Sequence, residues 1–373
     1  MLSAPATVGM PLSEVDTPAL LIDLDALERN IARMQAKVAH TSIRLRPHAK
    51  THKSTTIANM QIAAGAIGVC CQKVSEAEIM VDGGVRDVFV SNEVVGRKKL
   101  ERLAALARRA KVSVCVDDAG NVEALAAAAA MFGSTIDVLV EMNVGANRCG
   151  VETPDDVVRL AGAIAKHAAL RFAGIQAYQG SAQHFRLYEE RHAAIARATE
   201  KVQATLRLLR EAGLSCETVA GAGTGTFEFE IASKVYNELQ VGSYIFMDAD
   251  YGQNKDRAGN FVSEFENALF LLTTVMSSPM RERAVVDAGL KSLSVDSGMP
   301  RVTGIEGVSY ARASDEHGQL NVTAGNTRLS VGDKIKLIPG HCDPTVNLHD
   351  WFVGYRNERV ESVWPVSARG AVF

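Results

Sequence analysis

The 373-residue sequence has no cysteine pattern typical of a disulfide framework or a zinc site. Its six cysteines are neither spaced like those of a small secreted domain nor paired as repeated CxxC motifs. No apolar run reaches the length of a membrane span, and the N-terminus lacks a charged segment followed by an apolar one. We therefore expect a cytoplasmic protein that does not associate with a membrane.

An excess of positive charge is also missing. The formal net charge is −3, and neither a basic stripe nor an RNA-type aromatic pattern occurs, so nucleic acid is not expected as a partner. The chain is instead 47% hydrophobic and 22% charged, which is typical of a globular protein. Its length suits a large domain with a smaller one.

Strand-like and helix-like segments alternate through residues 25–262. Eight apolar segments typical of strands lie near residues 43–48, 67–71, 86–90, 112–116, 136–142, 172–178, 217–221 and 238–242. The intervening segments are rich in Ala, Leu, Glu and Arg, as helices are, for example at 97–110, 121–131, 155–167 and 189–212. This alternation predicts an α/β fold with a (β/α)8 TIM barrel, and a doubly wound open sheet is the alternative.

The two ends of the chain have a different character. Residues 263–373 contain short apolar segments separated by Gly, Pro, Asn and Asp, which predicts a C-terminal β domain with strands near 268–276, 284–287, 331–339 and 352–353. The extended apolar run Ala19–Asp23 predicts that residues 1–24 form a strand packed with this β domain. A helix is expected to follow, with Asp25 as its cap.

The segment around Lys50 is the one about which we expect the site to form. Its first predicted barrel strand ends at Pro47, which interrupts regular pairing. Lys50 follows within a few residues, where a barrel carries its chemistry. A lysine in this position, flanked by histidines, can form an imine with an aldehyde cofactor. A solvated basic turn has the same composition.

Polar residues follow three further predicted strands. Gln72 follows the second and is a candidate cofactor contact; Arg148 follows the fifth, and its planar guanidinium suits a phenolate or carboxylate. Tyr178 and His184 follow the sixth, where the tyrosine can stack on or hydrogen-bond a ring and the histidine can shuttle a proton. The structural alternatives are that Arg148 only holds its loop in place and that His184 only lies at the start of a helix.

The glycine-rich segment Gly221–Thr226 follows the seventh predicted strand and precedes a helix. Successive N–H groups and threonine hydroxyls can cradle a phosphate, which makes Gly223, Thr224, Gly225 and Thr226 candidates. The segment has neither a Walker lysine nor a dinucleotide fingerprint. A tight turn is the alternative, but barrels commonly bind phosphate at this position.

A His-x-Asp pair, His341 and Asp343, follows the predicted strand near 334–338. In an extended backbone both side chains point the same way, so they can share one cation, while Cys342 faces the other way. Two protein ligands plus waters form an open site for Mn²⁺, Mg²⁺ or Zn²⁺. An ordinary turn has the same sequence.

Together these motifs resemble those of the D-threonine aldolase and D-serine dehydratase group of fold-type III pyridoxal-phosphate enzymes, relatives of alanine racemase. The resemblance spans nearly the whole chain. The segments that carry it are Arg46–Lys53, Asn147–Gly150, Gln176–Gly180, Gly221–Thr226 and His341–Thr345.

The resemblance implies pyridoxal 5'-phosphate as cofactor, with Lys50 as its imine lysine; Lys53 and Lys73 are the alternatives. It further implies that Arg148 meets the phenolic oxygen, Tyr178 the ring and residues 223–226 the phosphate. The aldolase side of the group resembles His-x-Asp and the dehydratase side His-x-Cys. His341 and Asp343 fit the aldolase, with Mn²⁺ expected and Mg²⁺, Co²⁺ or Zn²⁺ as alternatives.

The expected activity is that of a lyase: retro-aldol cleavage of D-3-hydroxy-amino acids, such as D-threonine to glycine and acetaldehyde. His184 or a hydroxide on the metal is the candidate base. The alternative is a D-serine or D-threo-3-hydroxyaspartate dehydratase that gives a 2-oxo acid and ammonia, and a third hypothesis is a non-catalytic cofactor carrier. A homodimer is the assembly that we consider.

Overall fold

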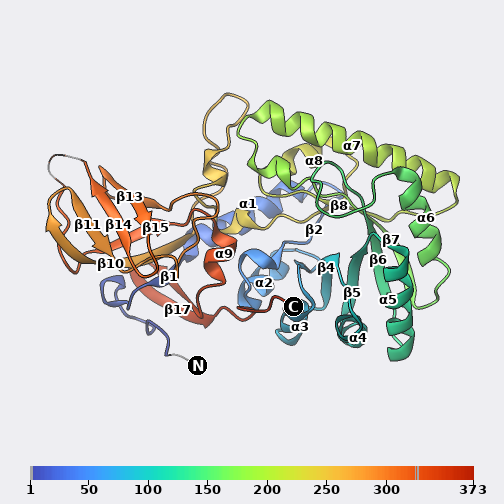
Figure 1. Cartoon of the computed structure of the whole chain (residues 1–373), viewed down its shortest axis with the longest axis horizontal. Helices are drawn as coiled ribbons and strands as arrows, with labels where there is room; N and C mark the ends of the chain where they lie inside the picture. Colours follow the sequence, from blue (N-terminus) through green and yellow to red (C-terminus); the bar gives the residue numbers. More distant parts are fainter. Residues whose placement is uncertain (1–2, 324, 326) are drawn as a thin grey trace.

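The computed structural model describes residues 3–323, 325 and 327–373. It has two lobes, which lie side by side in Figure 1. The helices and strands coloured from light blue to yellow form the lobe on the right, and the orange and red strands form the lobe on the left. We call them the barrel and the β lobe.

Eight parallel strands form the barrel sheet, in the order β2-β9-β8-β7-β6-β5-β4-β3. The two outer strands of this order also meet, because Ile67 N donates to Leu45 O at 2.9 Å and Cys70 N donates to Pro47 O at 2.8 Å. The sheet therefore curls round on itself, and the predicted barrel-type fold is confirmed. Its strands are β2 (Arg44–Leu45), β3 (Val69–Cys71), β4 (Asp87–Glu93), β5 (Lys111–Val116), β6 (Ile136–Glu141), β7 (Leu170–Gln176), β8 (Thr218–Gly221) and β9 (Glu238–Leu239).

Buried side chains on both faces of these strands explain why the sequence forms this sheet. One cluster combines Cys70, Phe89, Cys115, Leu139, Ala173 and Ala220 from neighbouring strands, and a larger one packs the strands against the helices. Within the described residues, no helix is both long and apolar enough to cross a bilayer. The helices are α1 (Leu24–Val38), α2 (Thr55–Ala63), α3 (Val74–Asp82), α4 (Arg97–Leu106), α5 (Ala119–Phe132), α6 (Pro154–Ile164), α7 (Tyr188–Glu211) and α8 (Phe227–Ser233).

The cap predicted for α1 is wrong by two residues. Asp23 caps the helix, because its Oδ1 accepts from Ala26 N at 3.0 Å. Asp25 lies inside the first turn and pairs with Arg356 of the β lobe. The helix begins earlier than expected because the strand before it ends at Asp23.

The β lobe is a mostly antiparallel sheet with one strand from the N-terminus. The strand β1 (Ala19–Asp23) lies between β10, to which it is antiparallel, and β16, to which it is parallel. The short helix α9 (Cys342–Val346) connects two of the later strands. The strands are β10 (Leu269–Met280), β11 (Arg283–Val286), β12 (Arg301–Thr303), β13 (Val308–Ala313), β14 (Gly318–Val322), β15 (Lys334–Ile338), β16 (Trp351–Arg356) and β17 (Arg359–Pro365).

A buried arginine ties three barrel strands together. Arg46 follows β2, and its side chain is 4% exposed. Its Nε donates to Glu238 of β9 at 2.8 Å, and its Nη1 donates to Asp87 of β4 at 2.6 Å. Burial opposes the charge of the guanidinium, but the two carboxylates outweigh it and raise the pKa of Arg46.

Removing this arginine leaves two carboxylates without their cation. We expect Arg46→Leu to lower the free energy of unfolding by about 3–5 kcal/mol, measured by urea denaturation. The matched control is Arg44→Ala, because the Arg44 side chain is 40% exposed and lies 3.4 Å from the same Glu238. The control should cost less than about 1 kcal/mol. Equal losses in the two variants would contradict this account of the barrel.

Candidate active site

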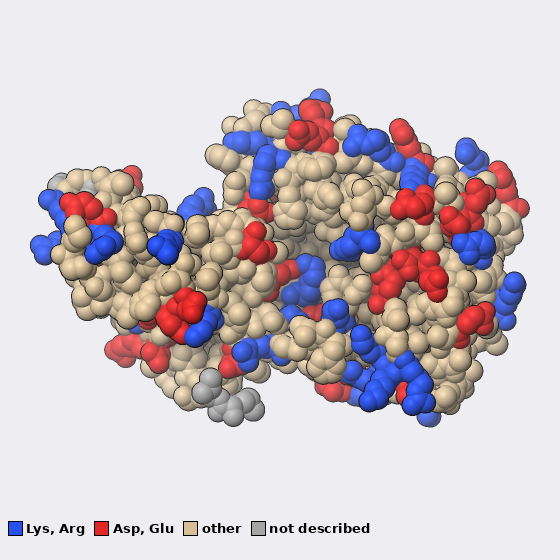
Figure 2. Space-filling view, in the orientation of Figure 1, with Lys and Arg blue, Asp and Glu red and all other residues tan. Residues whose placement is uncertain are grey.

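A cavity lies where the barrel strands end, beside the β lobe. Figure 2 shows the surface hollowed between the two lobes, with basic and acidic side chains meeting in the hollow. Strand carboxyl ends of a parallel barrel converge on one face, so residues far apart in the sequence meet here. The candidates that line the cavity are Lys50, Gln72, Arg148, Tyr178, Gly223 and Thr224.

Lys50 lies on a single turn of 3-10 helix (Ala49–Thr51) that His48 caps, since the His48 Nδ1 accepts from Lys50 N at 3.3 Å. The Lys50 ammonium donates to Asp343 of the β lobe. Burial alone would lower the pKa of Lys50, but the Asp343 carboxylate outweighs it and the pKa is raised. Burial and the charge of Lys50 hold the pKa of His48 well below its usual value, so His48 is neutral.

The two alternative lysines lie elsewhere. Lys53 is buried, and its Nζ donates to Glu76 at 3.2 Å and to the carbonyls of Ala368 and Ala371 at 3.4 Å. Lys73 is exposed at the start of α3. Of the three lysines considered, Lys50 is therefore the one that the fold directs into the cavity.

The glycine-rich loop divides into two halves. Gly223 and Thr224 face the cavity, and Thr224 Oγ1 is buried with no hydrogen-bond partner among the described residues. Gly225 and Thr226 are instead bonded to Gln183: Gly225 N donates to its Oε1 at 2.9 Å, and Thr226 Oγ1 accepts from its Nε2 at 2.8 Å. Only the first half of the predicted phosphate segment thus presents free polar groups to the cavity.

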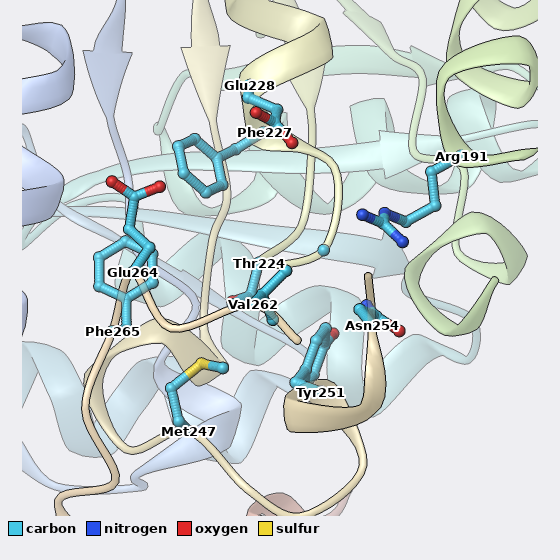
Figure 3. A pocket seen from close by; sticks show the side chains of 11 residues that line it. Arg191, Thr224, Phe227, Glu228, Met247, Tyr251, Asn254, Val262, Glu264 and Phe265 are labelled. Carbon is cyan, nitrogen blue, oxygen red and sulfur yellow. The ribbon is translucent and has the colours of Figure 1, made fainter. Parts of the chain in front are cut away.

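A second, smaller cavity shares Thr224 and Tyr251 with the first. Figure 3 shows Thr224 between Phe227 on one side and the Arg191 guanidinium on the other. Thr224 consequently forms part of the wall between the two cavities.

Arg148 extends from the loop after β6 toward Tyr178. Its guanidinium carbon lies 5.7 Å from the centre of the Tyr178 ring, and its Nη2 lies 3.7 Å from Oε1 of Glu141. Asn143 holds the loop, because its Oδ1 accepts from the backbone N–H groups of Gly145 and Asn147, both at 3.0 Å. The guanidinium is therefore directed over the cavity by a structured loop.

His184 lies beside the cavity rather than among its lining residues. Its Nδ1 contacts Oδ2 of Asp250 at 2.6 Å, and its ring lies 5.8 Å from the ring of Tyr251, which lines the cavity. Burial would raise the pKa of Asp250, but hydrogen bonds from His184 and Arg186 lower it. The aspartate binds Nδ1, which leaves Nε2 for other contacts.

The metal pair differs in local structure from the prediction. His341 is extended, with φ −144°, but Asp343 lies in the first turn of α9, so the extended-backbone argument was wrong. His341 Nδ1 contacts Asp296 at 2.8 Å. Burial would raise the pKa of Asp343, but Lys50 and His341 lower it to about 2. Cys342 is buried and donates to Met247 O, away from the cavity.

Asp343 keeps one oxygen available. Its Oδ2 contacts Lys50, whereas its Oδ1 is buried without a partner among the described residues. Within those residues no group of three or more His, Cys, Asp or Glu side chains could hold a metal ion. A cation here would have His341 and Asp343 as protein ligands, and solvent or substrate would complete its coordination.

Several residues of the cavity were missed from the sequence. Gly242 and Ser243 follow the last barrel strand, and a Cβ on Gly242 would lie 2.6 Å from Thr51 Oγ1, so only glycine fits there without a shift. The rule that strand ends carry the site would have found both residues had it been applied to the eighth predicted strand. Ser91, Gln240 and Tyr251 were also missed, whereas the lining residues His48, Thr51, Gln176 and Ala222 lie in predicted motif segments but were not named as candidates.

Comparisons with known proteins agree with this architecture. Residues 22–250 match the family model of the alanine racemase N-terminal domain, and residues 268–355 match that of a putative serine dehydratase domain. The chain is 51% identical to a 3-hydroxy-D-aspartate aldolase of Paracoccus denitrificans (strain Pd 1222), over 98% of this chain and 95% of that one. It is 48% identical to a D-threonine aldolase of Arthrobacter sp, over 99% and 97%.

The fold comparison gives the same result. The crystal structure of a D-threonine aldolase from Filomicrobium marinum matches with a TM-score of 0.97 and 53% identity over 100% of both chains. A D-threo-3-hydroxyaspartate dehydratase of Delftia sp. (strain HT23) is more distant, at 29% identity over 90% of this chain and 92% of that one. The chain therefore belongs to the D-threonine aldolase and D-serine dehydratase group of the alanine racemase-like family.

Proposed function

We propose that this protein cleaves D-3-hydroxy-amino acids by a retro-aldol reaction that depends on pyridoxal phosphate and a divalent metal. The observation that carries the proposal is the contact between the Lys50 amine of the barrel and the Asp343 carboxylate of the β lobe. Full-length similarity to a D-threonine aldolase and to a 3-hydroxy-D-aspartate aldolase supports it.

The residues of the cavity fit pyridoxal phosphate. Thr224 Oγ1 and Gln72 Oε1 are buried without partners among the described residues, as expected of groups that await a polar ligand. Lys50 would bind the aldehyde, Arg148 the phenolic oxygen, Tyr178 the ring, and the loop at Gly223 and Thr224 the phosphate. When bound, this cofactor supplies an aldehyde for the substrate amine and a ring that accepts the electron pair released at Cα.

His341 and Asp343 fit a divalent cation of the oxygen- and nitrogen-preferring kind. Mn²⁺ suits an imidazole with a carboxylate, and Mg²⁺, Co²⁺ or Zn²⁺ are alternatives. The Asp296 contact at Nδ1 orients the His341 ring and leaves Nε2 for the metal. When bound, the cation supplies a Lewis acid at the substrate β-oxygen.

Residues of the chain itself provide the base and shape the charge around the substrate. His184, fixed by Asp250, takes the proton of the β-hydroxyl at its Nε2. The neutral His48 neither repels the substrate nor adds charge beside Lys50. The ion pair between Lys50 and Asp343 places α9 of the β lobe against the turn that carries Lys50.

A dehydratase remains the second candidate, because relatives named as dehydratases match this chain in sequence and in fold. The carboxylate at position 343 favours the aldolase over the dehydratase pattern His-x-Cys. Cys342 offers no substitute thiolate, because burial raises its pKa well above the usual value and its Sγ faces Met247 O.

The products separate the two reactions. Mn²⁺-loaded protein with pyridoxal phosphate should convert D-threonine into equal amounts of glycine and acetaldehyde, quantified by chromatography and by an aldehyde-linked assay. L-threonine is the matched control and should not react. Formation of 2-oxobutanoate and ammonia would instead establish the dehydratase.

Lys50 should be indispensable because it is the lysine that the fold directs into the cavity. We expect Lys50→Ala to lower kcat by at least about 10³-fold and to remove the absorption band of the lysine-bound cofactor. The exposed Lys73→Ala is the matched control and should keep both. Loss of the band in Lys53→Ala rather than in Lys50→Ala would show that Lys53, and not Lys50, binds the cofactor.

The metal can be tested by removal and return. Treatment with EDTA should abolish cleavage of D-threonine, and Mn²⁺ should restore it. His341→Ala and Asp343→Asn should weaken Mn²⁺ binding by roughly 10–100-fold or more, measured by calorimetry. The exposed His317→Ala is the control. Full activity in the stripped protein would rule out a catalytic metal.

A further inference from the structure

Glu93, which is partly buried, and Glu141, which is buried, form a pair of carboxyls that the proposed function does not use. Glu93 ends β4 and pairs in register with Cys115 of the next strand, which in turn pairs with Leu139 of β6. Glu141 follows two residues later at the end of β6, where its side chain is 6% exposed. The two carboxyls thus meet over β5, next to the loop that carries Arg148.

One oxygen of each carboxyl is buried among described groups that do not hydrogen-bond to it. Glu93 Oε1 and Glu141 Oε2 are both buried, and neither has a hydrogen-bond partner among the described residues. Glu93 raises the pKa of Glu141 both by its charge and by a side-chain hydrogen bond, so the two carboxyls face each other. Two ionised carboxylates repel each other, whereas one added proton gives a short O–H···O bond between them.

The side chains next to the pair are two neutral thiols and the cationic Arg148, so Arg148 balances the charge of the pair. Cys115 from β5 contacts Glu141, and Cys149 from the loop contacts Glu93. Burial and Glu93 raise the pKa of Cys149 to about 11, and burial raises the pKa of Cys115 well above its usual value, so both thiols stay neutral. Arg148 Nη2 lies 3.7 Å from Glu141 Oε1.

One further carboxylate lies at the end of β5. Asp117 Oδ2 accepts from Gly150 N at 3.0 Å, so Asp117 fixes the end of the Arg148 loop. The pair and Arg148 therefore form a unit whose charge depends on the number of protons that the pair holds. With one proton the pair carries a charge of −1, which balances the positive charge of the Arg148 guanidinium.

We propose that Glu93 and Glu141 hold one proton between them and so act as positioning residues for Arg148. The proposal deepens the proposed function and rests on it, because Arg148 acts there on the cofactor. Burial and the charge of Glu93 raise the pKa of Glu141 to about 8, in agreement with a retained proton at neutral pH.

Alkaline pH should release this proton and change the site. Above about pH 8 the pair carries −2, which attracts Arg148 away from the cofactor and repels the cofactor's own negative charge. The same proton links folding to pH. A glutamate in the unfolded chain releases its proton near pH 4.5, so this pair makes the protein less stable as pH rises from there to about 8.

Glutamine substitutions distinguish a shared proton from two ordinary carboxylates. In Glu93→Gln or Glu141→Gln the amide donates to the remaining carboxylate, so each single variant keeps the hydrogen bond and the charge of −1 without a proton to lose. The double variant has no charge to balance Arg148. Glu152→Gln is the matched control, because Glu152 belongs to the same region and its side chain is 70% exposed.

Infrared spectroscopy reports the proton directly. The wild-type protein should show a protonated-carboxyl band at about pH 7 that is lost by about pH 9.5. The band should be absent from both single variants and present in Glu152→Gln. Glu230 is also buried, with a pKa of about 8, so the spectra are recorded in a Glu230→Gln background. A wild-type band unchanged in both single variants would overturn the proposal.

Affinity for pyridoxal phosphate gives a second readout, measured by fluorescence titration of protein from which the cofactor has been removed. Between about pH 7 and about pH 9.5 the wild-type dissociation constant should rise about three- to tenfold more than that of either single variant. The double variant should bind about tenfold more weakly at about pH 7. Identical pH dependence in the wild type and both single variants would contradict the shared proton even if one variant failed to fold.

Neither readout needs turnover, so the two proposals can fail separately. If the protein shows the band but does not cleave D-threonine, the shared proton is supported and the proposed function is refuted. If the protein cleaves D-threonine but shows no such band, the proposed function is supported and the shared proton is refuted.

Discussion

The contact between Lys50 and Asp343 is the interaction on which the rest of the architecture depends. The barrel supplies the ammonium and the β lobe supplies the carboxylate. One further hydrogen bond holds α9 against the barrel: Asp248 accepts from Cys342 N at 3.3 Å, and its other oxygen accepts from Tyr251 N of its own segment at 2.9 Å. An ion pair of this kind depends on the mutual placement of two lobes, so any change in how the lobes pack changes the site.

The fold holds this placement with backbone bonds between the lobes. Ala249 N donates to Pro339 O at 2.9 Å, and Asp250 N donates to Gly340 O at 3.2 Å. The same aspartate contacts His184, so a single segment of the barrel joins the candidate base to the strand exit that carries His341. Backbone hydrogen bonds do not depend on side-chain identity, which makes them a robust means of fixing distances between catalytic groups.

The sequence was most informative where burial determines structure. The barrel strands are buried on both faces and therefore appear as continuous apolar runs, so all eight were predicted within a few residues. In the β lobe, β12, β13, β14 and β17 were missed, and strands such as β13 are mostly exposed and contain few apolar residues. Edge and solvent-facing strands leave only a weak periodic signal.

The site could be predicted as residue types at strand ends, but not as a set of contacts. Lys50, Arg148 and Tyr178 were found because strand ends of a barrel converge. The division of Gly221–Thr226 could not be found, since Gln183 engages its second half from a different loop. The turn of α9 at Asp343 was equally hidden, because local sequence does not show which lobe will pack against it.

The central position of β1 has a consequence for synthesis of the chain. Its two neighbours, β10 and β16, begin about 250 and 330 residues later in the sequence. A ribosome releases β1 first and its partners last, so this apolar strand waits without a sheet while the whole barrel is made. The β lobe can mature only after translation is nearly complete, and nascent chains of this protein are expected to need protection of that one exposed segment by a chaperone.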